Sequence, residues 1–337
     1  MAEKARPLIS ARCLRQNRER LRMNKPRFSI VVPVYRAESC LRPLHERLIR
    51  VLDTLPGGFE IILVEDGGRD ASWAAIEEIC LRDPRVKGVK LSRNFGQHAA
   101  ITAGLDRAAG DLIVIMDCDL QDLPEAIPQL YEKATEGFDI VLARRSTRND
   151  PLFRRIASRA FYAFLGYMTG TSQDAAIANF GMYSRRAVEA VLSMRENLRY
   201  FPAMIRWVGF RSVAVDVEHA DGSDRPSSYT LGKLLRLALN VVLSFSEKPL
   251  RLAVKLGFVI SFLSVVWALV LFLRAVIVRQ SVPGWSSLIV SVWFLSGLII
   301  FVLGVVGLYV GKVFAEVKHR PLYIVEKTVP VEESENQ

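Results

Sequence analysis

Residues 113–125 read IVIMDCDLQDLPE, an apolar run that ends in a concentration of acidic and amide side chains. The run from Ile113 to Met116 has the composition of a buried strand. Four polar residues follow within six positions: Asp117, Asp119, Gln121 and Asp122. Side chains two residues apart share one face of a strand, so Asp117 and Asp119 are predicted to point the same way, with Cys118 turned away. Two carboxylates and a carboxamide oxygen suit Mg²⁺ or Mn²⁺, which complete their shell with waters and substrate phosphates.

Further apolar runs alternate with helical segments on both sides of this stretch. Strands are expected at 27–35, 59–68, 86–92, 111–119 and 138–145, with helices between them. This alternation predicts an α/β fold with a mostly parallel sheet and helices on both faces. Such sheets bind ligands outside the carboxyl ends of their strands, so the polar residues at those ends form one candidate site. They are Tyr35, Glu65, Asp66, Arg93, Asn94, Asp117 to Asp122, Arg144 and Arg145.

Several function classes lack their expected motifs in this chain. No GxxxxGK[ST] loop is present, which argues against an ATPase, and no GxGxxG follows the first strand, which argues against a dinucleotide dehydrogenase. Four cysteines, at positions 13, 40, 80 and 118, show no paired spacing. They indicate a reducing compartment, with neither a disulfide framework nor a cysteine metal site.

Two long apolar runs lie in the C-terminal part of the chain, at about residues 253–277 and 287–311. Each exceeds the roughly 20 residues that cross a bilayer. Basic residues flank the pair on its outer sides: Lys248, Arg251, Lys312, Lys318, His319 and Arg320. The positive-inside rule then places both flanks in the cytoplasm and the connecting hairpin outside. We therefore predict a two-helix transmembrane hairpin, the alternative being a buried helix pair of a soluble protein.

The formal net charge is +10, and a basic cluster lies at the N-terminus. Such a cluster suits anionic lipid or nucleic acid, and the membrane hairpin in the same chain favours lipid. Two simpler interpretations of this cluster stay open: it is a solvated tail, or translation begins at Met23. Residues 228–250 are leucine-rich and include Lys233 and Arg236, which predicts interfacial helices lying on the bilayer. A core helix is the alternative there.

These patterns divide the chain into five parts. They are a basic tail (1–26), a cytoplasmic catalytic domain (27–227), interfacial helices (228–250), two transmembrane helices (251–312) and a cytoplasmic C-terminal tail (313–337).

Several motifs together resemble those of inverting family 2 glycosyltransferases with the GT-A fold. They are SIVVPVY, EIILVEDGGRD, LSRNFGQHAAITAGL, GDLIVIMDCDLQDLPE, RWVGF and VGLYVGKVFAEVKHRPLYIV. Within the family, the chain resembles the polyprenyl-phosphate glycosyltransferases, such as dolichyl-phosphate mannose synthase, bactoprenol glucosyltransferase and undecaprenyl-phosphate aminoarabinose transferase. The resemblance covers about residues 27–327. It implies an enzyme of the bacterial inner membrane that moves a sugar from a UDP- or GDP-sugar to a polyprenyl phosphate, with undecaprenyl phosphate expected. It is also compatible with a homo-oligomer such as a tetramer, and it implies no nucleic-acid partner.

The resemblance assigns the donor site to the sheet edge. Six residues would bind the nucleotide sugar: Pro33, Tyr35, Glu65, Asp66, Asn94 and Asp117. The first two would line the uridine or guanosine pocket, and one of the two carboxylates after the second strand would accept base N–H groups. Asp117, Asp119 and Gln121 would hold Mg²⁺ or Mn²⁺ with the diphosphate, and the ion would polarise the leaving group, so Asp119 counts as catalytic.

The resemblance also implies an acceptor site. Arg145 and Arg154 would hold the acceptor phosphate, because guanidinium groups match phosphate geometry. A solvated basic face near anionic lipid is the alternative. A phosphate monoester is mostly dianionic at pH 7 and needs little help from a base. Asp174 is the candidate for that optional role.

The chain departs from the family pattern at several positions. Many relatives read close to GDFRL where this chain has ANFGM, with Asn179 and Gly181 in place of Asp and Arg. The usual D-D-G-S is Glu65-Asp66-Gly67-Gly68, and the usual Y-N-E is Tyr35-Arg36-Ala37. His98 lies in RNFGQHAA, which resembles the aminoarabinose transferase branch, although a packing role is equally open. These departures leave the donor sugar and the catalytic base undecided.

Two rival functions share sequence features with this chain. A processive polysaccharide synthase would carry Q-x-x-R-W, but Ala203 stands where the glutamine would precede Arg206-Trp207, and two spans are few for a polymer channel. A catalytically inactive membrane scaffold of the same fold is the second rival. The intact acidic motif argues against it, while Asn179 and Gly181 keep it open.

Overall fold

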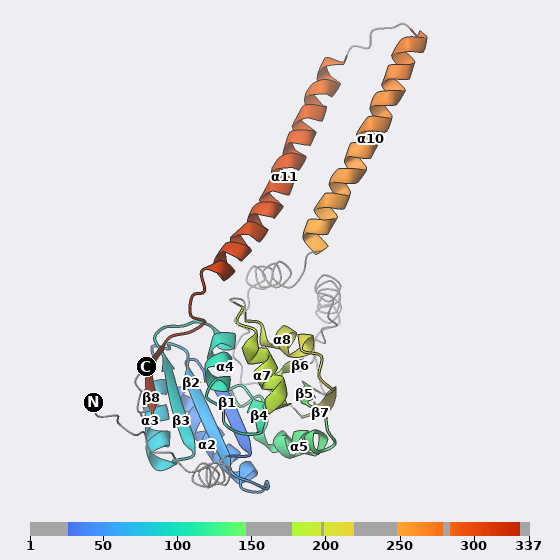
Figure 1. Cartoon of the computed structure of the whole chain (residues 1–337). Coiled ribbons are helices and arrows are strands. Elements are labelled where there is room, and N and C mark those ends of the chain that lie inside the picture. Colours follow the sequence, from blue (N-terminus) through green and yellow to red (C-terminus); the bar gives the residue numbers. More distant parts are fainter. Residues whose placement is uncertain (1–25, 146–176, 197–198, 219–247, 279–283, 331–337) are drawn as a thin grey trace, which may run out of the picture.

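The computed structural model describes residues 26–145, 177–196, 199–218, 248–278 and 284–330. A sheet with helices packed on it forms the body of the molecule, and two long helices extend away from it (Figure 1). In chain order the elements are β1 (Phe28–Val34), α2 (Glu38–Leu52), β2 (Phe59–Glu65), α3 (Ser72–Arg82), β3 (Val86–Leu91), α4 (Gln97–Leu105), β4 (Leu112–Ile115), the 3-10 turn η1 (Pro124–Ala126), α5 (Ile127–Thr135), β5 (Ile140–Arg145), β6 (Ile177–Ser184), α7 (Arg185–Ser193), α8 (Phe201–Trp207), β7 (Ser212–Val217), α10 (Lys248–Val278), α11 (Trp285–Val317) and β8 (Val325–Val329).

The strands form one mixed sheet in the order β7-β5-β6-β4-β1-β2-β3-β8. Strands β3, β2, β1 and β4 are parallel neighbours, whereas β6 runs antiparallel to both β4 and β5. Because β6 opposes both neighbours, β5 points the same way as β4. The carboxyl ends of β1 to β5 therefore share one edge, as the sequence predicted. The insertion of β6 and the antiparallel β8 were not predicted, and they make the sheet mixed.

Helices cover both faces of the sheet, which confirms that prediction. One core cluster joins the sheet to α2, α3 and α5, and the other joins it to α4, α7 and α8. Strand β1 serves both clusters by alternation, with Ile30 and Val32 in the first and Val31 in the second. All seven residues of β1 are buried, which accounts for its apolar sequence from Ile30 to Val34.

Strand β4 is shorter than the predicted strand 111–119, because it ends at Ile115. Asp117 and Asp119 lie in the turn that follows, so the alternation of a strand does not govern their directions. The prediction that they share a strand face is wrong. The turn reverses sharply at Leu120, which has a positive φ of 65°.

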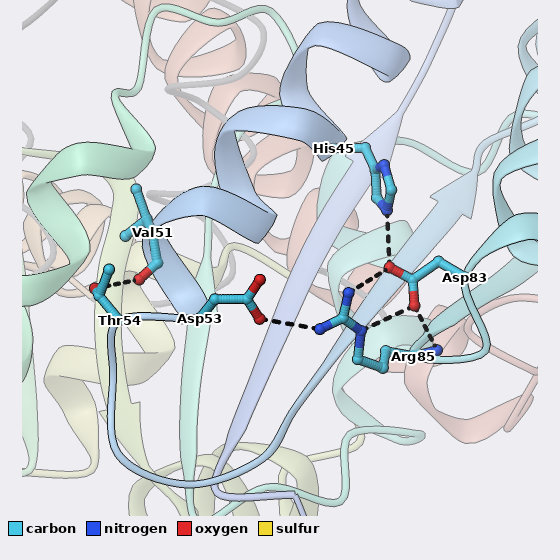
Figure 2. A network of polar contacts seen from close by, with 6 residues as sticks. All are labelled: His45, Val51, Asp53, Thr54, Asp83 and Arg85. Atoms are coloured by element: carbon cyan, nitrogen blue, oxygen red, sulfur yellow. Dashed lines mark hydrogen bonds and ion pairs between the residues drawn. The ribbon is translucent and has the colours of Figure 1, made fainter.

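A polar network fixes the ends of α2 and α3 against the start of β3 (Figure 2). Arg85 donates to both oxygens of Asp83, at 2.9 and 3.0 Å, and to Asp53 at 3.0 Å. His45 Nε2 lies 3.2 Å from Asp83 Oδ2. Burial alone would raise the pKa of Asp83, but the hydrogen bonds from Arg85 outweigh it and hold the pKa at about 2. This network lies at the amino end of β3, away from the candidate site.

Helices α10 and α11 contain 31 and 33 residues and run beside each other (Figure 1). The segment Ser291–Val317 has 27 residues and a mean hydropathy of 2.4, and none of its apolar part is buried inside the protein. By length and composition it is the one helix in the described part of the chain that could cross a membrane. The basic tail up to residue 25 and the predicted interfacial segment up to residue 247 lie outside the described residues.

Sequence reasoning placed residues 313–337 in a C-terminal tail and missed β8. This strand pairs antiparallel with β3, from Gly88 opposite Val329 to Leu91 opposite Val325. The amide of Ser92 also donates to Ile324 O at 2.9 Å. The chain therefore returns from α11 to the sheet and completes the edge next to β3.

Candidate functional site

The site lies at the edge where β1 to β5 end. Tyr35 follows β1 with 47% of its surface exposed, and the Arg36 guanidinium lies over its ring at 5.3 Å. Next to them, a groove of about 830 Å³ lies between α2 and α3, lined in part by Arg36, Arg42 and Asp70. Pro33 is buried inside β1, opposite Val64. An exposed aromatic ring offers a flat apolar surface for stacking.

Asp66 holds the loop between β3 and α4. Its Oδ1 accepts the amide of Phe95 at 2.7 Å and its Oδ2 accepts the amide of Gly96 at 2.9 Å. Asn94 Nδ2 donates to the backbone oxygen of Asp66 at 3.1 Å. Burial raises the pKa of Asp66, more than the two amides lower it. The two carboxylate oxygens thus each bind an amide of the loop.

Glu65 differs from Asp66 because only one of its two carboxylate oxygens accepts a hydrogen bond from the described residues. Its side chain is buried, and Oε1 accepts the amide of Gly68. Its Oε2 is also buried and has no hydrogen-bond partner among the described residues. Burial raises the pKa of Glu65 despite this backbone contact. Of the two carboxylates predicted to meet a base, Glu65 is the one with an unused oxygen.

The turn after β4 is organised by Asp122, one of the acids noted in the sequence, and by Gln97, which sequence reasoning did not single out. Gln97, the first residue of α4, donates from Nε2 to Asp117 Oδ1 at 2.6 Å. Asp122, which is buried, accepts the amide of Asp117 on Oδ2 at 3.2 Å. Asp119 is exposed, and its Oδ1 accepts the amide of Gln121 at 3.1 Å. These bonds hold Asp117 and Asp119 in one turn, which the spacing of the acids alone would not reveal.

The donor set of this turn fits an open divalent site. Asp117, Asp119 and Gln121 supply carboxylate and amide oxygens, the ligands that Mg²⁺ and Mn²⁺ prefer. Within the described ranges, no three His, Cys, Asp or Glu side chains converge into a closed metal cage. A site with few protein ligands is the kind that Mg²⁺ shares with substrate phosphates.

The residues assigned to the acceptor are only partly described. Arg145 is the last residue of β5, where its backbone lies opposite Val217. The preceding Arg144 donates to both oxygens of Asp216, at 2.6 and 2.8 Å. Arg154 and Asp174 lie outside the described residues. Since Arg144↔Ile177 are cross-strand partners, the start of β6 lies beside the end of β5 at the site edge.

Comparison with known proteins shows sequence similarity over most of the chain. The model of the Glycosyl transferase family 2 matches residues 29–192. The glycosyltransferase YkcC of Bacillus subtilis is 36% identical over 306 residues, which cover 90% of this chain and 95% of that protein. The chain belongs to glycosyltransferase family 2.

Two further relatives are named for lipid-linked chemistry. A prophage-derived bactoprenol glucosyl transferase of Shigella flexneri is 33% identical, over 90% of this chain and 98% of that protein. The undecaprenyl-phosphate 4-deoxy-4-formamido-L-arabinose transferase of Proteus mirabilis is 34% identical, over 90% of this chain and 94% of its own. The resemblance to the polyprenyl-phosphate glycosyltransferase group is thereby confirmed.

One departure of this family 2 glycosyltransferase from the motif pattern, Gly181, is matched by the packing around it. A Cβ at Gly181 would lie 2.7 Å from Val141 O and 2.8 Å from the Tyr183 hydroxyl. Tyr183 is buried, packs edge-on against Phe201 at 5.2 Å, and donates to Asn179 O at 3.1 Å. The Tyr183 ring thus occupies the space that a side chain at position 181 would need.

Proposed function

We propose that this glycosyltransferase moves a sugar from a UDP- or GDP-sugar to a polyprenyl phosphate, with undecaprenyl phosphate as the expected acceptor. The observation that carries the proposal is the similarity over about nine-tenths of the chain to transferases named for bactoprenol and undecaprenyl phosphate. An apolar helix of 27 residues in the same chain supports a lipid acceptor, because the polyprenyl part of such a substrate resides in a bilayer.

The donor would bind along the edge from β1 to β4. Tyr35 and Pro33 would face the base, and Glu65 would accept a base N–H on the oxygen that now has no partner among the described residues. Asp66 would act through the backbone, because its carboxylate fixes the amides of Phe95 and Gly96. Asn94 would hold this loop in place beside the nucleotide.

Asp117, Asp119 and Gln121 would hold Mg²⁺ or Mn²⁺ together with the donor diphosphate. When bound, the ion would act as a Lewis acid that neutralises the leaving group. Gln97 orients the Asp117 carboxylate, and Asp122 fixes the Asp117 amide. Asp119→Asn should abolish transfer while the protein stays folded, because Asp119 is exposed and its loss leaves no buried group unpaired. Full activity of this variant, or full activity in excess chelator, would refute the metal assignment.

The acceptor phosphate would attack the sugar directly. One of its oxygens forms a bond to the anomeric carbon, the bond from that carbon to the donor diphosphate breaks, and the electron pair leaves with the nucleoside diphosphate. Attack from the opposite face inverts the anomeric centre. Because the monoester is mostly dianionic at pH 7, Asp174 as a base would be optional.

Arg145 and Arg154 would hold this phosphate. Each charge-assisted contact contributes roughly 1.5–3 kcal/mol, about ten- to a hundredfold in affinity. Arg→Ala at either position should raise KM for the polyprenyl phosphate far more than KM for the nucleotide sugar, and Arg→Lys should rescue only in part. A small, salt-sensitive change for both substrates would instead identify these arginines as solvated surface charge.

The membrane arrangement belongs to the same proposal. The helices at 253–277 and 287–311 would form a two-span hairpin, preceded by interfacial helices at 228–250. The catalytic domain and both termini would face the cytoplasm of a bacterial cell, and the basic residues 1–26 would contact anionic lipid. A homo-oligomer such as a tetramer would be compatible with this arrangement.

One assay tests the function as a whole. The purified full chain is incubated with undecaprenyl phosphate, Mg²⁺ or Mn²⁺, and a panel of UDP- and GDP-sugars, and the lipid fraction is analysed by mass spectrometry. A gain of one sugar on the lipid is the expected result. A polymeric product would favour a processive synthase, and no product with any donor would favour an inactive scaffold.

A further inference from the structure

A polar stripe on α4 faces the connection between α7 and α8. His98, Thr102 and Asp106 follow one another at a spacing of four residues and so lie on one side of the helix. Asp106 accepts both Arg195 nitrogens, at 2.8 and 3.1 Å, and the Tyr323 hydroxyl at 2.7 Å. This end of the stripe is therefore fully neutralised.

Beside Thr102 the stripe meets Arg199, whose hydrogen bonds within the described part of the chain go to neutral acceptors. Arg199 is only 7% exposed. Its Nε donates to Thr102 Oγ1 at 3.2 Å and its Nη1 to Met194 O, both neutral acceptors. Burial and the neighbouring Arg195 lower the pKa of Arg199, and the charges of Asp106 and Glu196 offset this only in part. A buried guanidinium whose charge is only partly balanced favours a bound anion.

His98 adds an unused polar atom beside this cation. Its Nδ1 is buried and has no hydrogen-bond partner among the described residues. Its ring packs edge-on against Tyr200 at 5.2 Å, and the backbone oxygen of His98 accepts the Thr102 hydroxyl at 2.8 Å. Burial and the nearby Arg199 lower the pKa of His98 to about 4, so the ring is neutral at pH 7. A neutral imidazole with a free Nδ1 can donate one hydrogen bond to an oxygen.

His98 directly follows a residue that contacts the candidate diphosphate site. His98 is the second residue of α4, and the residue before it, Gln97, contacts Asp117 at 2.6 Å. The amide of Gly96 is bound by Asp66 at 2.9 Å. An anion beside His98 would thus lie close to the edge where the sugar would be transferred.

We propose that Arg199 and His98 form a binding site for a phosphate oxyanion, with the guanidinium supplying the charge and the imidazole a directed donor. The source of this phosphate rests on the proposed function: it would belong to one of the two substrates, either the polyprenyl phosphate or the nucleotide diphosphate. The competing explanation is purely structural. In that case Arg199 serves only to satisfy Met194 O, which ends α7.

Binding of inorganic phosphate to the full chain tests the site without any turnover. Unfolding midpoints are measured with and without phosphate, at ionic strength matched by chloride. His98→Ala leaves the contact between Arg199 and α7 intact, and Arg199→Lys keeps the charge without the planar fork. Each variant should bind phosphate at least about tenfold more weakly than the original chain. Arg82→Ala is the control, because this exposed arginine is paired with Glu78 on α3, on the opposite face of the sheet from α4, and its phosphate affinity should be unchanged.

The substrates then identify the source of the phosphate. A rise in KM of about tenfold for the polyprenyl phosphate alone assigns the site to the acceptor, and the same rise for the nucleotide sugar alone assigns it to the donor. Lower stability with unchanged phosphate affinity in both variants would overturn the proposal and leave Arg199 as the cap of α7. Weaker phosphate binding with both KM values unchanged would overturn the assignment to a substrate. If no transfer is detected in any variant, the proposed function fails, while the phosphate measurements still decide the site.

Discussion

Asp66→Asn is the substitution that most directly tests how the donor edge is held. The Asp66 carboxylate binds two amides of the β3–α4 loop, Phe95 at 2.7 Å and Gly96 at 2.9 Å, one on each oxygen. Asparagine has the same shape, but only one of its two terminal atoms accepts a hydrogen bond. One of the two loop amides must then face an NH₂ group. The substitution therefore removes an acceptor while leaving the volume of the side chain unchanged.

The size of the effect follows from these two bonds. A hydrogen bond to a charged group contributes roughly 1.5–3 kcal/mol, a neutral one about 0.5–1.5, and a buried donor left unpaired costs about 1–3. Removing a carboxylate whose pKa is raised by burial returns part of this loss, because the charge itself was costly to bury. We expect a net loss of about 2–3 kcal/mol in the stability of the loop. That corresponds to a roughly 30- to 150-fold larger equilibrium population of the locally open loop.

Amide hydrogen exchange of the full chain measures this opening. Residues 93–97 should lose protection by that factor, and KM for the nucleotide sugar should rise, because the loop leads into Gln97 and its bond to Asp117. Asp70→Asn is the matched control. Asp70 is an exposed carboxylate in the loop after β2, and it accepts the Ser72 hydroxyl at 2.6 Å, a bond that asparagine can keep. Equal protection of residues 93–97 in both variants would refute the role given to Asp66.

Two further predictions concern residues that stabilise the sheet around the site. Asp83 has a pKa of about 2 in the folded chain and about 4 in the unfolded chain. Its ionised form should therefore contribute about 2 kcal/mol to the free energy of unfolding above pH 5, and this contribution is lost as the pH falls toward 2. Urea unfolding across this pH range should show the loss, and Asp83→Asn should make the stability less dependent on pH. Gly181→Ala should lower stability by about 1–3 kcal/mol in thermal unfolding, since its Cβ would lie 2.7 Å from Val141 O and 2.8 Å from the Tyr183 hydroxyl, and an unchanged midpoint would show that Tyr183 can move aside.

The alternation of apolar runs and helical segments predicted the main elements because the central strands β1 and β2 are buried on both faces. Strand β2 is buried at all seven positions, and its apolar run from Ile61 to Val64 ends at Glu65. The order of the strands could not be predicted in the same way. Strand β6 inserts antiparallel between β4 and β5, and nothing in its composition specifies its neighbours or direction. Strand β8 was missed because it is short, lies at the sheet edge and has exposed charged residues such as Lys327.

The candidate site was predicted as a set of residues but not as an arrangement. The acids after β4 were recognised from their density, yet their geometry depends on Asp122 and Gln97, which bind Asp117 from five positions later and twenty positions earlier. Such partners are set by how the chain folds back on itself, and no local pattern contains that information. Likewise, Glu65 and Asp66 are adjacent acids in the sequence. Only their contacts separate a carboxylate that holds a loop from one with an unused oxygen.

Contacts of this kind also change the meaning of the departures from the family pattern. At Gly68, where serine is usual, an added Cβ would lie 2.9 Å from both Glu65 Oε1 and Asp70 Oδ1. The longer Glu65 side chain, in place of the usual aspartate, brings its oxygen to the Gly68 amide and fills that space. A side chain at position 68 would therefore require the ends of the Glu65 and Asp70 side chains to shift. Gly181 is coupled to Tyr183 in the same way, since the tyrosine ring fills the volume that a side chain at 181 would need. Substitutions compensated by packed neighbours are not marks of a decaying site, so Gly181 no longer argues for an inactive scaffold.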